Sequence, residues 1–399
     1  MSIASGASGA SGASGASGAS GASGASGASA DGGNVAVTTG ALISARDGIS
    51  GPFKVTAPTL LNGNDTSNMR RWDPSTRAVT IEAELLSRLL FIESVGPADS
   101  SDPGTTQPKI DVYHVGGDPT NGLTPMLMLS FTRPKKDDFV LQTSLIENYV
   151  DLRVDRSAEI VSQLGYPTGF FMNILGMRSN DFKYTLEVIT VAQFFATMIA
   201  KRVKHSLACL RPDRFAPQIQ PMIATPGHGA LPSGHATEAF SVATMLSILT
   251  QNAVGPDARD LLLQQAARIA VNRTVAGVHF PADSIAGAVA GVVAGQYIAA
   301  MAAGGNVQSA VFNGPNVGAS DFNYKDLLRT STSGGASYMT ASLKNLPGGG
   351  TASSRIVSAS ANAIKIANGV AIDTDEDAKS NDLCLPLRGL WNLAQKEWD

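Results

Sequence analysis

The spacing of apolar residues along the chain predicts a mainly α protein. Apolar side chains recur at helical intervals in six segments: residues 76–94, 139–164, 180–210, 235–252, 256–271 and 281–303. Short links that contain Pro and Gly join the later helices, which favours neighbours packed side by side in a bundle. We therefore expect residues 138–303 to form a helical core.

Two weaker patterns flank this core. Residues 31–74 are rich in Gly, Asn, Thr and Pro and favour a long irregular arm, while residues 110–114 and 126–132 resemble two short strands of a small β-hairpin. Residues 31–137 are thus interpreted as an arm and hairpin. Residues 304–399 alternate Gly/Ser-rich loops with short helices, the last near 387–397, and should wrap against the bundle. Residues 31–399 then form a single large domain.

The first thirty residues differ from the rest in composition. Residues 4–29 repeat Ala-Ser-Gly without variation, which is typical of a flexible, solvated coil. Residues 1–30 are therefore interpreted as a low-complexity linker that is disordered. The segment has neither a basic start nor an apolar run, so it does not predict a secretory signal peptide.

Net charge and hydropathy limit which binding partners and which cellular location we expect for this protein. The formal net charge is −3 and charged residues are scattered, so neither nucleic acid nor an anionic membrane surface is an expected partner. Two cysteines, Cys209 and Cys384, are expected to be buried thiols of a reducing compartment; a single bridge between them is the alternative, so their number leaves the redox compartment open. Residues 284–305 are uncharged and long enough for a membrane span, but they are mostly Ala and Gly and include Gln296. We expect a buried helix, no membrane span, and a soluble, cytoplasmic protein.

Three short segments carry the residues suited to chemistry. They are Lys204-x6-Arg211-Pro212, Pro232-Ser233-Gly234-His235 and Arg273-x5-His279-x3-Asp283. Taken one by one, each has a purely structural alternative: a solvated helix stripe, a helix cap, and a histidine with an acidic residue near a helix start.

The predicted helices give each segment a position at a chain turn. Pro212 should end a helix directly after Arg211, with Lys204 on the same helical face. Ser233 and Gly234 should cap the next helix and present free N–H groups. Pro281 should open a third helix, with His279 just before it and Asp283 in its first turn, where the carboxylate can orient the imidazole.

The three segments complement one another chemically. Three cations, two helix starts and two histidines together suit a single tetrahedral oxoanion, with the histidines available for proton transfer or ligation. Few structural cores require this set. The sequence therefore predicts an enzyme with an oxoanion-binding active site.

In order and spacing, these segments resemble the signature shared by the type-2 phosphatidic-acid phosphatases, the bacterial non-specific acid phosphatases and the vanadium-dependent haloperoxidases. The resemblance covers Lys204 to Asp283, about a fifth of the chain, and departs from the usual pattern at Asn272, where a Ser is common. It implies helical bundles of the vanadium haloperoxidase/acid phosphatase type. It also implies that oxoanion oxygens are held by Lys204, Arg211, Ser233, Gly234 and Arg273.

The resemblance implies catalytic roles for His235 as acid–base and for His279. In a haloperoxidase His279 would bind vanadium of a vanadate cofactor, one per chain, and the partners would be hydrogen peroxide, halide and a small organic acceptor. In a phosphatase His279 would instead form a phosphohistidine during hydrolysis of phosphomonoesters. A third alternative, a non-enzymatic scaffold, predicts that neither oxoanion protects the protein against heat. The resemblance is also compatible with a homo-oligomer.

Three features favour the haloperoxidase branch. Long segments flank the bundle, the helix opens Ser-Gly-His-Ala-Thr, and His228 lies seven residues before His235, where bromide-oxidising members also place a histidine. An exposed histidine in a flexible turn is the alternative for His228. Lys201 argues the other way, since an aromatic residue is frequent at its position. Our hypothesis is a vanadate-dependent haloperoxidase that oxidises bromide or iodide rather than chloride, to hypohalous acid or halogenated organic products.

Overall fold

The computed structural model describes residues 35–52, 54–63, 65–98, 106–118, 122–324, 355–356, 364–372 and 383–399. The linker predicted at residues 1–30 lies outside these ranges. The chain divides into two units, Met1–Thr76 and Arg77–Asp399.

The first unit contains more regular structure than its composition suggests. A helix, α1, spans Val35–Ile49, and a 3-10 helix, η2, spans Thr66–Arg71. The Asp65 side chain caps η2 by accepting a hydrogen bond of 2.8 Å from Ser67 N. The prediction of a wholly irregular arm was therefore wrong at α1. No proline interrupts residues 35–49, and each glycine there costs about 1 kcal/mol of helix stability without forbidding a helix.

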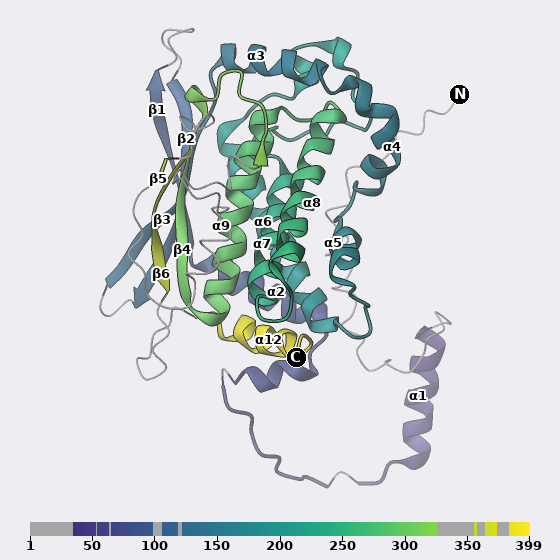
Figure 1. Ribbon diagram of the computed structural model, residues 1–399. Coiled ribbons are helices and arrows are strands. Elements are labelled where there is room, and N and C mark those ends of the chain that lie inside the picture. The colour runs from purple at the N-terminus through teal and green to yellow at the C-terminus, as the bar shows by residue number, and fades with distance from the viewer. Residues whose placement is uncertain are drawn as a thin grey trace. The chain divides into compact units, whose positions relative to one another are not determined.

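Four long helices form the core of the second unit (Figure 1). They are α6 (Lys183–Leu207), α7 (Gly234–Leu249), α8 (Pro256–Val275) and α9 (Pro281–Ala303). Helix α7 lies against the other three. The mainly helical prediction is confirmed, and α9 has the predicted bounds because Pro281 and Gly304 flank it.

Three glycines let α9 approach the backbone of α7. Gly287, Gly291 and Gly295 recur every fourth residue, so they lie on one face of α9. A Cβ atom on Gly287 would lie 2.7 Å from Ser233 O, and one on Gly295 would lie 2.5 Å from Ser241 O. Any larger side chain at these positions would force the helices apart. The stripe therefore holds the N-terminal ends of α7 and α9 together, where the chemical segments begin.

Shorter helices surround this core. They are α2 (Pro74–Ser87), α3 (Lys136–Glu147), η3 (Val150–Leu152), α4 (Arg153–Ser162), α5 (Thr168–Leu175), η4 (Pro212–Arg214), η5 (Pro217–Ile219), η6 (Gly314–Asn316) and α12 (Leu385–Gln395). The single helix predicted at 139–164 is wrong, because α3 ends at a C-cap, Asn148, and the chain turns through η3 before α4 starts. Both cysteines are buried and free, as predicted.

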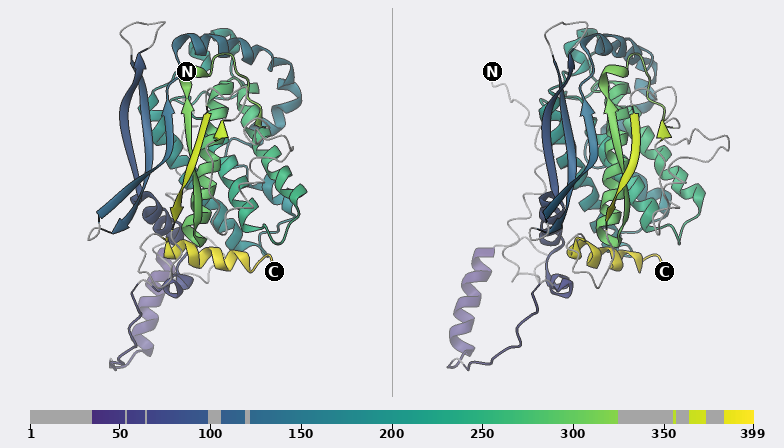
Figure 2. Two further views of the ribbon diagram at one scale, coloured as in Figure 1. Left: turned by 60° about the vertical axis from the view of Figure 1, so that its left-hand side comes forward. Right: turned by 90° about the vertical axis from the view of Figure 1, so that its left-hand side faces the viewer.

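A six-stranded sheet lies beside α9 (Figure 2). Its order is β1 (Leu89–Ala98), β2 (Thr106–Asp118), β3 (Gly122–Thr132), β4 (Gly305–Asn313), β6 (Ile364–Ile372) and β5 (Arg355–Ile356). The predicted hairpin is present as β2 and β3, with Ile110 opposite Phe131. All neighbours are antiparallel except β3 and β4.

The sheet corrects two predictions. The helix expected to reach residue 94 ends at Ser87, and Leu89 and Leu90 instead begin β1. The tail after the bundle starts with a strand, β4, where loops and short helices were expected, although the last short helix predicted near 387–397 is present as α12. Both errors concern apolar runs whose strand character depends on pairing with another strand, which for β4 lies far along the chain, as in the pairing of Leu129 with Ala310.

Candidate active site

The N-terminal ends of α7 and α9 meet and bring two chemical segments together. Ser233 is the N-cap of α7, and its hydroxyl accepts a hydrogen bond of 3.4 Å from Ala236 N. Its own N–H donates to Asp283 O at 2.8 Å, which joins the two helix starts directly. Gly234 is the first residue of α7 and has no Cβ to shield the N–H groups of that turn. The capping role predicted for Ser233 is confirmed.

His279 and Asp283 form a buried pair at the start of α9. His279 Nδ1 lies 2.9 Å from Asp283 Oδ2, and the same oxygen accepts a hydrogen bond of 2.9 Å from Phe280 N. An ionised carboxylate only accepts, so Nδ1 carries the proton and Nε2 keeps its lone pair. Nε2 faces Arg211 Nη1 at 2.9 Å. The expected orientation of the imidazole by Asp283 is therefore present.

Arg211 reaches His279 from a turn rather than from a helix. Helix α6 ends at Leu207, where Ala208 adopts a left-handed conformation (φ 49°), and Arg211 has extended backbone before η4. The prediction that a helix continues to Arg211 was thus wrong. Its guanidinium donates to His228 O at 3.1 Å and to Val278 O at 2.8 Å, so the side chain is anchored by carbonyl groups.

Lys204 lies in the last turn of α6 and is 2% exposed. Its ammonium donates to Gly229 O at 3.0 Å and to Ala230 O at 2.7 Å. A lysine ammonium has three donors, so one remains for a ligand. Among the described residues no carboxylate forms a salt bridge with it, and Asp283 compensates part of its positive charge at longer range.

Arg273 in α8 is 1% exposed and has spare donors. Nη2 donates to Ile160 O at 3.3 Å and to Gln163 Oε1 at 3.1 Å. Among the described residues, Nε and Nη1 are buried without a hydrogen-bond partner. Unpaired buried donors on a cation are costly, and they are what a bound oxoanion would satisfy.

His235 follows Gly234 in the first turn of α7. Its Nε2 lies 2.7 Å from the carbonyl oxygen of Gln163. A carbonyl only accepts, so Nε2 is the protonated nitrogen and Nδ1 is the basic one in the neutral ring. His235 thus has one fixed tautomer, which suits a group that accepts and returns a proton.

His228 lies beside the other site residues but is more open to solvent. Its Nδ1 is 3.1 Å from Arg211 Nη2 and 3.2 Å from Gly229 O. The structure therefore brings His228 to Arg211, rather than leaving it in a detached turn.

The electrostatics of the pocket follow from buried cations with few carboxylates. Burial, and then the charge of Arg273, lowers the pKa of His235 to about 3. Burial, followed by Arg211 and Lys204, lowers the pKa of His279 well below its usual value. Burial raises the pKa of Asp283 to about 6, against the opposing effect of Lys204. Near neutral pH both histidines are neutral bases beside an ionised aspartate.

This arrangement suits a tetrahedral oxoanion. Three cations, Lys204, Arg211 and Arg273, lie in or near one buried region together with the α7 helix start. Desolvating an unpaired cation costs several kcal/mol, which a multiply charged anion offsets. The orphaned donors of Arg273 and the lone pair of His279 therefore fit phosphate or vanadate equally well.

Gln163 was not anticipated from the sequence. It is fully buried after α4, accepts from Arg273 through its side chain, and accepts from His235 through its backbone. Asn272, the departure from the usual pattern, also donates to Gln163 Oε1 at 3.0 Å. No local signal marks Gln163, because its partners lie 72 or more residues later in the chain.

Comparison with known proteins agrees with the site. Residues 183–304, which include α6 to α9, match the PAP2 superfamily. This match supports placing the helical core in that superfamily, whose members are generally enzymes and include both phosphatases and haloperoxidases. No curated protein matches the chain.

The match and helix α9 together correct the expected location. Many members of the superfamily are membrane proteins, and within the described residues α9 is the helix long and apolar enough to cross a membrane. Its most apolar stretch is 94% buried, as in the core helix of many soluble proteins. The prediction of a soluble, cytoplasmic protein was therefore wrong.

Proposed function

We propose that this protein is a vanadate-dependent haloperoxidase. The observation that supports this reading over other oxoanion chemistry is the position of His228, whose imidazole contacts the guanidinium of Arg211, which in turn contacts His279 Nε2. The imidazole of His228 would therefore lie next to the oxoanion, where it would offer a hydrogen-bond donor to halide or peroxide. The comparisons do not separate this reading from a phosphatase.

The residues present would hold vanadate in a defined way. His279 Nε2 would bind the metal, and Lys204, Arg211 and Arg273 would hold the oxygens together with Ser233 and the N–H of Gly234. Bound vanadate supplies a Lewis acid that activates hydrogen peroxide toward halide without a change of oxidation state. Hypohalous acid, or a halogenated organic compound, is the product.

The protein side chains contribute charge, orientation and proton transfer. Asp283 keeps His279 in the tautomer that leaves Nε2 available. The Gln163 carbonyl keeps His235 Nδ1 basic, so His235 can take a proton from incoming peroxide. The negative charge of the oxoanion would raise the pKa of His235, so the same nitrogen can return that proton.

The second candidate is an acid phosphatase, in which the His279–Asp283 pair would supply the nucleophile. Nε2 of His279 would attack phosphorus as the bond to the leaving alcohol breaks, and the alcohol would take a proton from His235, whose pKa the charge of the bound phosphate ester would raise. Water would then give a proton to His235 and attack the phosphorus of the phosphohistidine, the N–P bond would break, and inorganic phosphate would leave. This candidate assigns no role to His228.

The deciding experiment measures both activities on one sample. Bromide- and iodide-dependent consumption of peroxide is followed with and without orthovanadate, beside hydrolysis of p-nitrophenyl phosphate. Vanadate-dependent halide oxidation that disappears in His279→Ala supports the haloperoxidase. His205→Ala is the matched control, since His205 lies next to Lys204 on α6 but is exposed.

Three other outcomes are informative. Phosphate release inhibited by vanadate, without halide oxidation, would establish the phosphatase instead. Halide oxidation that requires haem or iron would exclude vanadate chemistry. If neither activity appears and neither oxoanion raises the melting temperature, the fold is a scaffold without the proposed site.

A further inference from the structure

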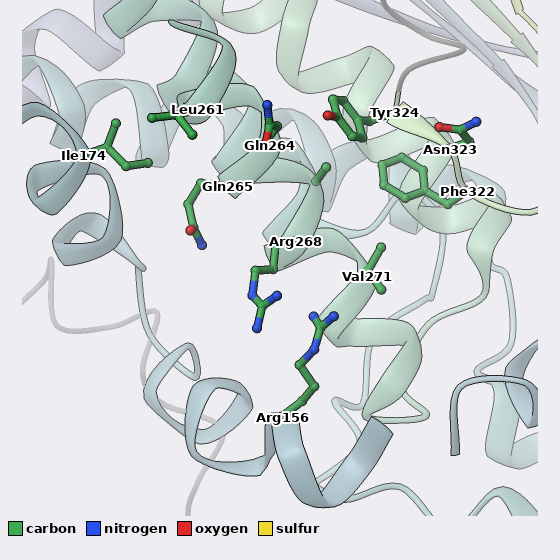
Figure 3. Close-up of a pocket in the computed structure, with 11 residues that line it drawn as sticks. Arg156, Ile174, Leu261, Gln264, Gln265, Arg268, Val271, Phe322, Asn323 and Tyr324 are labelled. Carbon is green, nitrogen blue, oxygen red and sulfur yellow. The ribbon is translucent and has the colours of Figure 1, made fainter. Parts of the chain in front are cut away.

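A second pocket lies on the outer side of α8, and we call it the α8 pocket. It encloses about 490 Å³, a volume typical of small-molecule sites, between α4, α5, α8 and residues 322–324 (Figure 3). Its lining includes Arg156, Ile174, Leu261, Gln265, Arg268 and Val271. Arg268 and Arg273 are five residues apart, about 140° around the helix, so the α8 pocket and the oxoanion site use different faces of α8.

Two arginines from different helices converge in the α8 pocket. Arg156 extends from α4 and Arg268 from α8, and their guanidinium groups approach each other (Figure 3). Arg268 pairs with Glu159, with Nε at 2.9 Å and Nη2 at 2.7 Å from Oε2. Arg156 Nη1 instead donates to the neutral amide oxygen of Asn272 at 2.9 Å. Within the part of the chain that the structure describes, only Arg268 of these two arginines therefore has a directly bonded carboxylate.

The charge of Arg156 is incompletely compensated. Burial and then repulsion by Arg268 lower the pKa of Arg156, and the carboxylates of Glu159 and Asp155 oppose this shift without cancelling it. An anion between the two guanidinium groups would relieve the repulsion. Because Arg156 has no directly bonded carboxylate among the described residues, while Glu159 and Asp155 already compensate part of the charge, a monoanion suits the site better than a multiply charged one.

The remaining walls are mixed rather than purely polar. Ile174, Leu261 and Val271 give an apolar surface, while Gln265 lies on the same helix as Arg268. Gln265 Nε2 is buried and has no hydrogen-bond partner among the described residues. An anionic ligand with a small apolar body would cover the apolar wall and place an acceptor near the amide.

We propose that the α8 pocket binds a small organic monocarboxylate. The carboxylate lies between the guanidinium groups of Arg156 and Arg268, and the apolar body lies against Ile174, Leu261 and Val271. This site is separate from the oxoanion site and goes beyond the proposed function, since it needs neither vanadate nor turnover.

Calorimetric titration with benzoate, and with benzamide as its uncharged counterpart, tests the proposal. We expect one benzoate per chain at micromolar to millimolar affinity and at least tenfold weaker binding of benzamide. Arg156→Gln should weaken benzoate binding at least tenfold, whereas Arg178→Gln, which changes an exposed arginine outside the pocket, should leave it unchanged. Benzoate binding should persist in Arg273→Met, in which the oxoanion site is disabled.

A second variant is needed because local misfolding in Arg156→Gln would also weaken benzoate binding. Gln264 is an exposed residue of the pocket wall, and Gln264→Trp fills the pocket while both arginines remain. It too should weaken benzoate binding at least tenfold. The proposal is overturned if benzoate does not bind, if benzamide binds as well as benzoate, or if Gln264→Trp leaves the affinity unchanged. Loss of benzoate binding in Arg273→Met would also overturn it, because the ligand would then occupy the oxoanion site.

Discussion

The oxoanion site and the α8 pocket both gather arginines, but they surround them differently. In the oxoanion site Arg211 and Arg273 are nearly inaccessible and are held by carbonyl oxygens and one amide. In the α8 pocket the side chain of Arg268 is 48% exposed and has a carboxylate partner. Water and Glu159 already satisfy much of Arg268, whereas Arg273 retains unpaired buried donors. The comparison indicates that only the buried arrangement depends strongly on a bound anion.

Arg273→Met should produce the largest effect. Loss of one preorganised, buried cation should lower turnover by about 10²–10³-fold or more. Without oxoanion, the variant should be more stable than the parent by about 1–4 kcal/mol, because an unpaired buried charge is replaced by an apolar side chain. Turnover and chemical denaturation are the measurements.

Arg268→Met on the same helix is the control for Arg273→Met. Its exposed pair with Glu159 should contribute less than about 1 kcal/mol, and turnover should stay within twofold. If both variants lose activity equally, or if Arg273→Met destabilises the anion-free protein, the contrast between the two sites is incorrect.

Asp283→Asn should have the next largest effect. The amide oxygen can still accept from Phe280 N and from His279 Nδ1, but it lacks the carboxylate charge that raises the basicity of His279 Nε2. Activity should fall by about 10–100-fold, as for other carboxylates that orient a functional histidine. Asp257→Asn is the matched control, because Asp257 occupies the first turn of α8 without contacting the site. Equal losses of activity in the two variants would indicate that Asp283 acts only through its charge at the start of a helix.

The stability of the anion-free protein should fall with acidification. His235 has a pKa lowered from 6.5 to about 3, so its contribution is complete above pH 6.5 and is lost as the pH falls through this window. His279 acts in the same direction. Asp283, raised from 3.8 to about 6, acts oppositely: its contribution is complete below pH 3.8 and is lost as the pH rises through 6.

The combined effect of two histidines on the free energy of unfolding exceeds the opposite effect of one carboxyl group. The melting temperature should therefore decrease from pH 7 to pH 4. Added phosphate should reduce this decrease, because its negative charge raises the pKa of both imidazoles. Melting curves with and without phosphate at matched ionic strength provide the measurement. If phosphate left the pH dependence of the melting temperature unchanged, the two histidines would not belong to the oxoanion site.

His228→Ala should have the smallest effect of the site variants. Its side chain is exposed and Arg211 keeps its bonds to two carbonyl groups, so phosphate or vanadate affinity should change by less than about threefold, or below 1 kcal/mol. Halide kinetics should change more than oxoanion affinity if His228 handles halide. Unchanged halide kinetics would leave His228 as a loop residue.

Local sequence signals predicted those parts of the site that depend on helix ends. Ser233 and Pro281 mark the starts of α7 and α9, and the spacing of His279 and Asp283 places both side chains on the same side of one helix start. These features follow from capping preferences and from 3.6 residues per turn, which act over a few residues.

Other features could not be predicted, because their partners are distant in the sequence. Gln163 contacts His235 and Arg273 across at least 72 residues. The strand β4 pairs with β3, which precedes it by more than 170 residues. Arg211 lies outside α6 because Ala208 turns the chain early, although Pro212 alone suggested a later end.

The sequence by itself determined the residue types of the site, the order of the helices and the positions of their N-terminal ends, since these depend on short-range backbone and side-chain preferences. The tertiary structure alone decided that the cations would be buried without directly bonded carboxylates among the described residues, that His235 and His279 would each have one tautomer, and that a second arginine pair would line a separate pocket. Burial and long-range hydrogen bonds set charge states and tautomers, and both arise only when distant segments pack together.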